Sequence, residues 1–508
     1  MKITRREAIK LGLVGSGTLL SPLGFPSIAL AQFSPQIQPF DLPFRTPPEL
    51  KPVRSDETTN PPTDYYEIVM QKAEVEILPG RKTEIWGYNG ITPGPTIRQR
   101  GGKLEDGNRQ SVVRFINHLD IDTSIHLHGM ASLPQYDGYA NDLISPAYYK
   151  DYIYPNNRAS TLWYHDHAVG NTSRNVYRGL AGMYIVEDKF ELDLPLPKGE
   201  YDVPLIIQDK RFASDGSLIF DDRGQKGLYG DVMLVNGVPW PRMEVANRKY
   251  RFRVLNAGAS RTCQLRLSTG DDLIVIGTDA GLIDAPVRTK TLRIGIAERY
   301  GLIIDFSKYP IGTRVVLQNP ALPVNIDADA RSQIVMCFDV VRQESDNSSI
   351  PTPLRPVVPL LTSSALRTRT FRFERNGGQW KINNKTWDKD RVDANPGLGD
   401  VEIWNLVNTG GGWVHPVHIH LVDLQLLDRS GRAPLPYERG WKDVFYVGEN
   451  ETVRVITRFG PNLGKYMMHC HNIVHEDHDM MTQFEVGQGG YDPIKAAPAQ
   501  PISKMPPL

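Results

Sequence analysis

The chain has 508 residues, with 58 Lys plus Arg and 58 Asp plus Glu, so its formal net charge is zero. A neutral chain offers no global electrostatic attraction for nucleic acid or for an anionic membrane, and we expect neither as a partner. Short runs rich in Val, Ile, Tyr and Thr are separated by 44 Gly and 39 Pro. This pattern predicts an all-β protein of more than one domain.

The N-terminal residues 1–31 have the pattern of an export signal. Arg5 and Arg6 precede an apolar stretch at 11–20, and residues 29–31 (Ala-Leu-Ala) have the small residues of a cleavage site. The segment resembles a twin-arginine signal, which predicts an exported protein, periplasmic or otherwise, that uses the twin-arginine export machinery. A short anchor helix is the alternative, but Gly and Pro interrupt the apolar run and leave it too short to span a bilayer.

An internal repeat divides the rest of the chain into three parts. Asn89, Asn236 and Asn383 recur at equal spacing, and each precedes an alternating apolar segment that ends in Asn. Such alternation is typical of half-buried strands, so we expect three similar β domains and a loosely ordered Pro-rich tail. The domains and the tail are expected at 40–190, 200–345, 365–490 and 491–508.

Ten of the 12 histidines fall into four short clusters, all in the first and third parts of the chain. A lone histidine on a strand is commonly a core or surface residue, but repeated His-x-His spacing indicates metal ligands. No histidine lies between His167 and His415. Metal chemistry is therefore expected in the first and third domains and not in the second.

Strand geometry separates the ligands into two sites. Successive side chains point to opposite faces of a strand, so each His-x-His pair presents both imidazoles on one face. In His469-Cys470-His471 the thiolate then faces away from the two imidazoles, and one tripeptide contacts two metal sites. His415 has the opposite parity to the other histidines of its cluster, which favours the thiolate side, although Pro416 can distort that strand.

The thiolate side offers two imidazoles, one thiolate and one thioether, from His415, Cys470, His475 and Met480. This set is typical of a blue-copper electron-transfer site, whereas structural zinc sites are closed tetrahedra and thioether ligation favours copper. The other face collects eight neutral nitrogen donors, which suit several coppers held close together. These donors are His126, His128, His165, His167, His418, His420, His469 and His471.

With these motifs the mature chain resembles the multicopper oxidase family, and within it the bilirubin oxidases and bacterial spore-coat laccases. The resemblance rests on residues 413–420 (WVHPVHIH), residues 469–481 (HCHNIVHEDHDMM) and the two histidine pairs of the first domain. It implies three cupredoxin-like Greek-key β-sandwich domains and four copper ions. One type 1 copper is expected in the third domain, and one type 2 and two type 3 coppers between the first and third.

Carried over by position, the resemblance makes His415, Cys470, His475 and axial Met480 the type 1 ligands. The type 2 pair is then His126 and His418, and the type 3 ligands are His128, His165, His167, His420, His469 and His471. Every ligand position is filled, unlike in relatives of this fold that have lost their metals and act as scaffold or division proteins.

The implied activity takes single electrons from a small-molecule donor and passes them through Cys470 to a cluster that reduces dioxygen to water. Phenols, aromatic amines and linear tetrapyrroles are the expected donors. A cuprous or ferrous metallo-oxidase is an alternative, but such relatives often carry a Met-rich insertion that this chain, with 12 Met, lacks. Non-enzymatic copper storage or a copper-dependent scaffold is a third alternative, disfavoured by the complete ligand set.

The resemblance also implies two proton relays. Asp137 matches an acidic residue near the type 2 copper, and Glu476 matches one near the type 3 side. Their alternatives are a turn residue before Gly138 and a solvated loop charge, because only a carboxylate with a tuned pKa relays protons.

Further positions stay open from the sequence. Trp413 either lines the electron-entry face or packs in the core. Cys263 and Cys337 either form a disulfide, as some relatives do, or remain buried thiols. His118 and His478 match no ligand motif and are predicted to be structural.

Overall fold

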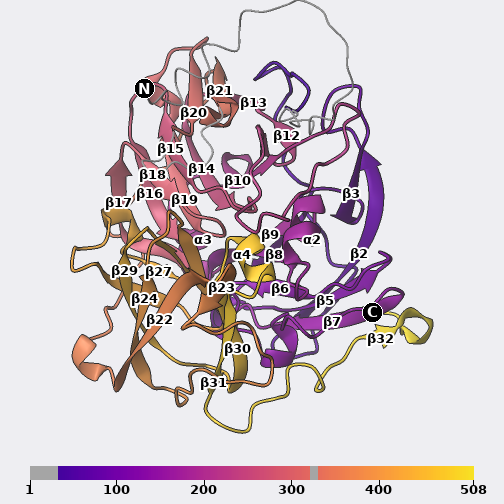
Figure 1. The fold of residues 1–508 in the computed structure, drawn as a ribbon. Helices are drawn as coiled ribbons and strands as arrows, with labels where there is room; N and C mark the ends of the chain where they lie inside the picture. Colours follow the sequence, from indigo (N-terminus) through magenta and orange to yellow (C-terminus); the bar gives the residue numbers. More distant parts are fainter. Residues whose placement is uncertain (1–32, 321–329) are drawn as a thin grey trace, which may run out of the picture. The chain divides into compact units, whose positions relative to one another are not determined.

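The computed structural model describes residues 33–320 and 330–508, so the predicted export signal lies outside the described residues. From Ser34 onward the regular secondary structure of the described chain is mostly strands, which form six sheets, with a few short helices (Figure 1). We group these sheets by sequence into a first, a middle and a third sheet pair. The predicted all-β fold is confirmed.

The first sheet pair is formed by the N-terminal part of the chain, with one strand from the C-terminus. Its sheets have the orders β1-β2-β5-β7-β32, with β3 beside β2, and β4-β9-β8-β6. The elements are β1 (Arg54–Asp56), β2 (Thr63–Val75), β3 (Thr83–Tyr88), β4 (Gly94–Arg100), β5 (Gln110–Asn117), β6 (Ile125–His128), β7 (Tyr148–Tyr154), β8 (Ser160–Asp166), α2 (Thr172–Arg178), β9 (Ala181–Glu187), α3 (Lys189–Asp193) and β32 (Gln500–Pro501).

The middle sheet pair has the orders β12-β11-β10-β14-β19-β16-β17 and β13-β21-β20-β15-β18. Its strands are β10 (Asp202–Lys210), β11 (Val232–Val235), β12 (Val238–Pro239), β13 (Arg242–Ala246), β14 (Lys249–Asn256), β15 (Cys263–Leu267), β16 (Leu273–Thr278), β17 (Gly281–Thr289), β18 (Leu292–Ile294), β19 (Arg299–Asp305), β20 (Arg314–Gln318) and β21 (Ile334–Arg342).

The third sheet pair has the orders β23-β22-β24-β29-β26-β27 and β28-β25-β30-β31. Its elements are β22 (Arg367–Asn376), β23 (Gln379–Ile382), β24 (Val401–Asn408), β25 (His415–Ile419), β26 (Leu424–Arg429), β27 (Trp441–Lys442), β28 (Val444–Val447), β29 (Thr452–Arg458), β30 (Gly464–Cys470), α4 (Ile473–Asp477) and β31 (Met481–Val486).

The repeated Asn marks the same turn in each sheet pair. Asn89, Asn236 and Asn383 all have positive φ, at 55°, 50° and 52°, a conformation that Asn tolerates better than most residues. Each side-chain oxygen accepts a backbone N–H from a strand, namely that of Val69, Ile206 and Arg372. Those strands each pair in parallel with the following Asn-ended strand: β2 with β5, β10 with β14, and β22 with β24. The repeat in the sequence is thus a repeat of topology.

Apolar packing joins the three sheet pairs. The largest buried cluster contains Trp163 from β8, most of the inward side chains of the middle sheet pair, and Val444 and Val474 from the third. A separate cluster fills the first sheet pair and another fills the third. Because one core crosses between sheet pairs, the domain boundaries proposed above stay predictions.

The C-terminal tail, residues 491–508, was expected to be loosely ordered, and this expectation is wrong. Strand β32 pairs with β7 and forms the edge of that sheet, where Pro is tolerated because an edge strand needs fewer donors. The Ile502 N–H donates to the Ala147 carbonyl at 2.9 Å, and Arg114 donates to the Pro506 carbonyl at 2.5 Å. Hydrogen bonds to the backbone therefore hold a segment whose composition suggests disorder.

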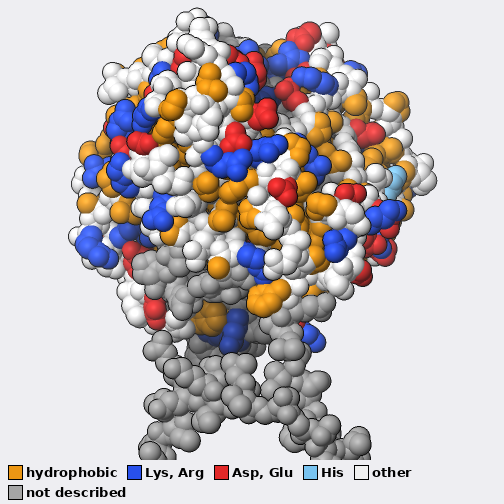
Figure 2. All heavy atoms as spheres, turned by 90° about the horizontal axis from the view of Figure 1, so that it is seen from above, with side chains coloured by type: hydrophobic (Ala, Val, Ile, Leu, Met, Phe, Trp, Pro, Cys, Tyr) orange, Lys and Arg blue, Asp and Glu red, His pale blue; other side chains and the backbone are white. Residues whose placement is uncertain are grey.

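One face of the molecule shows how the charged side chains are distributed. On the face drawn in Figure 2, acidic and basic side chains are intermixed around hydrophobic ones rather than gathered into one field. Across the residues that the structure describes, no helix has both the length and the apolar character needed to cross a membrane.

Candidate functional site

Eight imidazoles from the first and third sheet pairs converge inside the protein. They lie on, or one residue beyond, β6, β8, β25 and β30, and each is at most 1% exposed. Antiparallel register places His126 opposite His165, and His418 opposite His469. The strand-parity argument thus has its physical basis in four short strands that present His-x-His pairs toward one another.

Several of these imidazoles meet nitrogen to nitrogen. The Nε2 atoms of His126 and His418 are 3.3 Å apart, and His469 Nε2 lies 3.1 Å from the Nε2 atoms of both His167 and His420. One proton can satisfy one such contact but not two converging on the same atom. Nitrogen lone pairs gathered in this way are suited to metal ions.

Unpartnered nitrogens support the same interpretation. Among the described residues, His128 Nδ1, His165 Nε2 and both ring nitrogens of His471 are buried without a hydrogen-bond partner. A buried polar atom without a partner costs about 1–3 kcal/mol, so such a set is expected where a ligand satisfies it. The donor set therefore fits copper ions.

Burial favours the neutral form of seven of these imidazoles. Desolvation and the neighbouring imidazoles lower the pKa of His165 to about 3, and desolvation lowers the pKa of His167 to about 4. The pKa values of His126, His128, His418, His420 and His471 are likewise lowered by burial and by the adjacent rings. Neutral imidazole is the form that binds metals.

Asp137 lies against two of the imidazoles. His420 Nδ1–H donates to Asp137 Oδ2 at 2.8 Å, and His126 Nδ1–H donates to the Asp137 backbone carbonyl at 2.5 Å. These bonds leave the Nε2 atoms of both rings available to a metal. Asp137 is only 3% exposed, and burial raises the pKa of its carboxyl group well above the usual range.

Glu476 occupies the corresponding position beside another pair of rings. Its Oε2 lies 3.0 Å from His469 Nδ1, and its Oε1 lies 3.6 Å from His167 Nδ1. Desolvation raises the pKa of Glu476, but the electrostatic attraction of the His469 and His167 rings and the hydrogen bond from His469 outweigh it and hold the pKa below its usual range. Both predicted relay carboxylates are thus buried and in contact with candidate ligands.

The thiolate site lies on the other side of β30. Cys470 Sγ is 3.4 Å from His415 Nδ1 and 3.7 Å from His475 Nδ1, and all three side chains are buried. The Cys470 N–H donates to the Met480 carbonyl at 3.1 Å, and both residues belong to one apolar cluster. Burial raises the pKa of the Cys470 thiol, so metal binding here must release a proton.

Helix α4 connects the two sites, because it carries His475 of the thiolate site and Glu476 of the imidazole cluster. The next residue, Asp477, accepts hydrogen bonds from the backbone N–H groups of Thr172 and Ser173 at 2.9 and 2.8 Å. These bonds tie α4 to α2, which lies beside it in Figure 1. Helix α2 is thereby joined to the helix that carries residues of both sites.

Three residues at the sites were missed by sequence analysis. Trp380 stacks on His475 with ring centroids 3.7 Å apart, Asp443 accepts from His128 Nε2–H at 2.9 Å, and Arg299 pairs with Asp443. Each comes from a strand or connection that has no metal-ligand motif. The only available signal was the position of Trp380 three residues before the repeated Asn383.

The remaining predicted positions have simple surroundings. Trp413 is half-buried and lies edge-on to Trp380 and His475. Cys263 and Cys337 are buried, unpaired thiols, so the structure has no disulfide between them. His118 is exposed, and His478 Nε2 lies 3.7 Å from Asp222 Oδ2.

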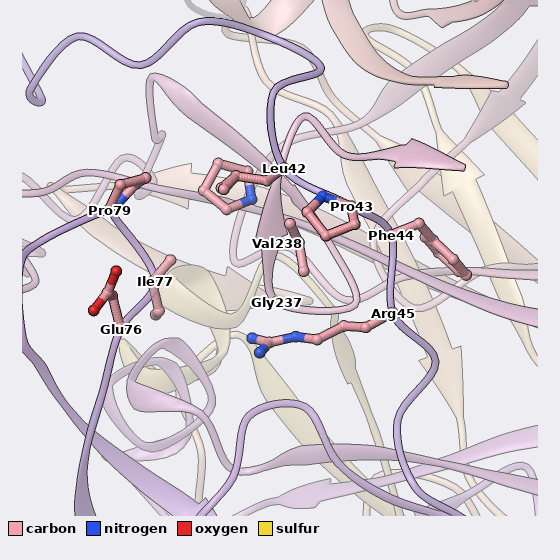
Figure 3. A pocket seen from close by; sticks show the side chains of 10 residues that line it. Leu42, Pro43, Phe44, Arg45, Glu76, Ile77, Pro79, Gly237 and Val238 are labelled. Atoms are coloured by element: carbon pink, nitrogen blue, oxygen red, sulfur yellow. The ribbon is translucent and has the colours of Figure 1, made fainter. Parts of the chain in front are cut away.

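A surface pocket of about 200 Å³ lies apart from these sites (Figure 3). Its walls come from the N-terminal segment 42–45, from Glu76 and Ile77, and from the turn at Gly237 and Val238. None of the candidate metal ligands lines it.

Comparison with known proteins agrees with this geometry. Family models described as multicopper oxidase match residues 69–191, 213–328 and 353–490. The chain is 40% identical to the bilirubin oxidase of Albifimbria verrucaria, over 90% of this chain and 82% of that protein. It is 35% identical to the laccase of Bacillus subtilis (strain 168), over 87% of this chain and 97% of that protein.

Among solved structures, the laccase from Pediococcus acidilactici Pa5930 superposes with a TM-score of 0.80 at 31% identity, covering 90% of this chain and 95% of that one. The expected cupredoxin-like β-sandwich architecture is confirmed by this likeness and by the sheets described above. The chain therefore belongs to the multicopper oxidase family of oxidoreductases.

Proposed function

We propose that this protein is a laccase-type or bilirubin-oxidase-type enzyme. It takes single electrons from phenols, aromatic amines or linear tetrapyrroles and delivers four of them to dioxygen, forming water. The observation that carries this proposal is the His469-Cys470-His471 tripeptide. Its sulfur lies 3.4 Å from a ring nitrogen of His415 in one site, while His469 meets His167 and His420 in the other.

The proposed ligand sets are those that the resemblance to the multicopper oxidase family implies. His415, Cys470, His475 and Met480 hold a type 1 copper, and His126 and His418 hold a type 2 copper. Bound copper supplies one-electron redox chemistry and the capacity to store electrons for dioxygen. Two triads hold the type 3 pair, with ring centroids within each triad 4.8–5.7 Å apart. These triads are His167, His420 and His469, and His128, His165 and His471.

The backbone of β30 connects the sites covalently, because Cys470 is bonded to both His469 and His471. Asp137 and Glu476 relay protons to the cluster in this proposal. Asp137 Oδ2 accepts from His420, while its Oδ1 has no hydrogen-bond partner among the described residues and can carry the proton. A buried carboxyl group with a raised pKa retains that proton until the reaction consumes it.

The proposal includes export. Arg5 and Arg6, the apolar stretch and the Ala-Leu-Ala site support passage through the twin-arginine machinery to the periplasm or beyond.

Oxygen uptake tests the proposed function. Copper-loaded protein is supplied in turn with a phenol, bilirubin and a cuprous salt at equal copper content, with Cys470→Ser as the inactive control. We expect organic donors to sustain uptake. Uptake with cuprous ions alone would identify a metallo-oxidase, and a fully loaded protein without uptake from any donor would identify copper storage.

A further inference from the structure

We infer that Arg299, in the copper-free middle sheet pair, is a positioning residue for the imidazole cluster and acts through Asp443. This inference rests on the proposed function, because it takes His128 and His418 as copper ligands. Arg299 touches neither imidazole. It holds Asp443, which forms hydrogen bonds with both, and the middle sheet pair thereby contributes to the arrangement of the cluster.

Arg299 and Asp443 form a bidentate ion pair. Arg299 Nη1 donates to Asp443 Oδ1 at 2.6 Å and Nη2 donates to Oδ2 at 2.5 Å. Both residues are buried, with exposed fractions of 0% and 1%. The planar guanidinium matches the carboxylate in both position and plane, which a Lys ammonium cannot do.

Asp443 then fixes two imidazoles by different atoms. Its Oδ1 accepts from His128 Nε2–H at 2.9 Å, and its backbone carbonyl accepts from His418 Nδ1–H at 2.9 Å. His128 is thereby left with Nδ1 as its free lone pair, the atom that has no hydrogen-bond partner. His418 is left with Nε2, which faces His126. One residue therefore sets the tautomer of a ligand in each of two copper sets.

Arg299 is itself held from several directions. Its backbone N–H donates to Asp279 Oδ1 at 2.7 Å, and its Nε donates to the Thr161 carbonyl of β8 at 2.9 Å. Lys442 Nζ lies 2.8 Å from Asp279 Oδ2 and 3.0 Å from Glu298 Oε1, which extends the buried ionic network. The network joins all three sheet pairs, since Thr161 belongs to the first and Lys442 to the third.

The glycine after the first histidine pair makes room for this network. Gly129 has φ of +92°, and a Cβ there would lie 2.7 Å from Arg299 Nη2 and 2.8 Å from Asp443 Oδ2. Any other residue would collide with the ion pair and would also strain the backbone. The motif at residues 126–129 thus contains two candidate copper ligands, and its glycine leaves space for Asp443, which orients His128.

Arg299→Lys tests the inference, because it keeps the positive charge and removes the bidentate hydrogen bonding of the guanidinium group. Arg253→Lys is the matched control. Arg253 is also buried in the middle sheet pair. It forms a bidentate ion pair with Asp202, with Nε–Oδ1 and Nη2–Oδ2 distances of 2.9 and 2.8 Å, and it also donates a hydrogen bond to Thr161. Among the described contacts, Asp202 has none with a cluster imidazole.

The readouts are copper retained during dialysis against graded chelator, the blue absorption band and the electron paramagnetic resonance spectrum of the type 2 copper. We expect Arg299→Lys to keep the blue band, lose about 10–100-fold in affinity for cluster copper and alter the type 2 spectrum. Arg253→Lys is expected to lose thermal stability with neither change. Equal copper retention and identical type 2 spectra in the two variants would overturn the inference.

A second variant keeps the test decisive if Arg299→Lys does not fold. Asp443→Asn preserves side-chain volume but weakens the bond to Arg299 and must reproduce the cluster-specific defect. A normal type 2 spectrum and normal copper retention in folded Asp443→Asn would also overturn the inference. Failure of the proposed function is distinguishable, because it is measured by oxygen uptake of the wild-type protein, whereas this test measures copper retention and the type 2 spectrum of the variants.

Discussion

Cys470 is the residue at which the two proposed copper sites meet, so its replacement separates them. Cys470→Ser removes the thiolate and with it the charge transfer that colours a type 1 copper. We expect a folded, colourless and inactive protein, checked by visible absorption, circular dichroism and oxygen uptake. Cys263→Ser, another buried free thiol, is the control and should remain blue. A copper-loaded wild-type protein without the intense band would refute the assignment.

Met480 is expected to set the redox potential of the same site without being required for its assembly. Met480→Leu keeps an apolar side chain but removes a weak axial donor, which disfavours the cupric state more than the cuprous state. We therefore expect a blue protein with a raised type 1 potential, measured by redox titration. Met481→Leu is the control, because Met481 packs in a different cluster with Tyr139 and Met467. An unchanged or lowered potential in Met480→Leu would exclude axial ligation by this residue.

The buried carboxylates Asp137 and Glu476 are expected to act on protons rather than on copper binding. Asp137→Asn and Glu476→Gln preserve shape while abolishing titration. In stopped-flow experiments we expect normal bleaching of the blue band by donor without oxygen, followed by slow reoxidation on mixing with oxygen. Proton supply limits only the second phase.

Asp477→Asn is the control for those two carboxylates, because Asp477 is adjacent in sequence but bonds Thr172 and Ser173 instead of an imidazole. It should reoxidise normally while losing thermal stability. Normal reoxidation in both Asp137→Asn and Glu476→Gln would assign these carboxylates a structural role only.

At the scale of elements, the sequence predicted what depends on strand periodicity. The alternation of His469, Cys470 and His471 required two sites because side chains on a strand alternate faces. Asp443 and Arg299 could not be predicted in the same way. They meet across 144 residues through a connection and a strand of different sheet pairs, and neither stands in a motif. Contacts of this kind depend on tertiary packing, which local pattern does not encode.

The tail shows the opposite error, in which composition alone was misleading. Residues 491–508 look disordered because Pro limits hydrogen bonding, yet β32 requires few backbone donors at the sheet edge. Truncation after Gly490 removes the Arg114 bond to the Pro506 carbonyl and uncovers β7. We expect a loss of about 1–3 kcal/mol in unfolding free energy with an unchanged visible spectrum. Equal thermal midpoints for truncated and full-length protein would contradict the assigned role.

At the scale of the whole molecule, the three sheet pairs contribute different kinds of residues to the sites. The first and third supply the candidate ligands, and the middle supplies apolar core and the Arg299 network. Because the candidate ligands of the cluster come from two sheet pairs, copper bound there would cross-link distant parts of the chain. The eight imidazoles are buried, and several of their ring nitrogens lack a hydrogen-bond partner among the described residues, so we expect the folded state to favour bound copper.

Copper removal is therefore expected to destabilise the protein as a whole. A ligand that binds only the folded state stabilises it by about 4 kcal/mol at roughly 1,000 times its dissociation constant. Complete removal of copper should lower the thermal midpoint of unfolding, measured by calorimetry. Without copper, buried ring nitrogens such as those of His165 and His471 have no hydrogen-bond partner in the folded state. Protein lacking only type 1 copper, as in Cys470→Ser, should lose less, since that site lies within the third sheet pair. Equal midpoints for copper-loaded and copper-free wild-type protein would show that the cluster does not link the sheet pairs.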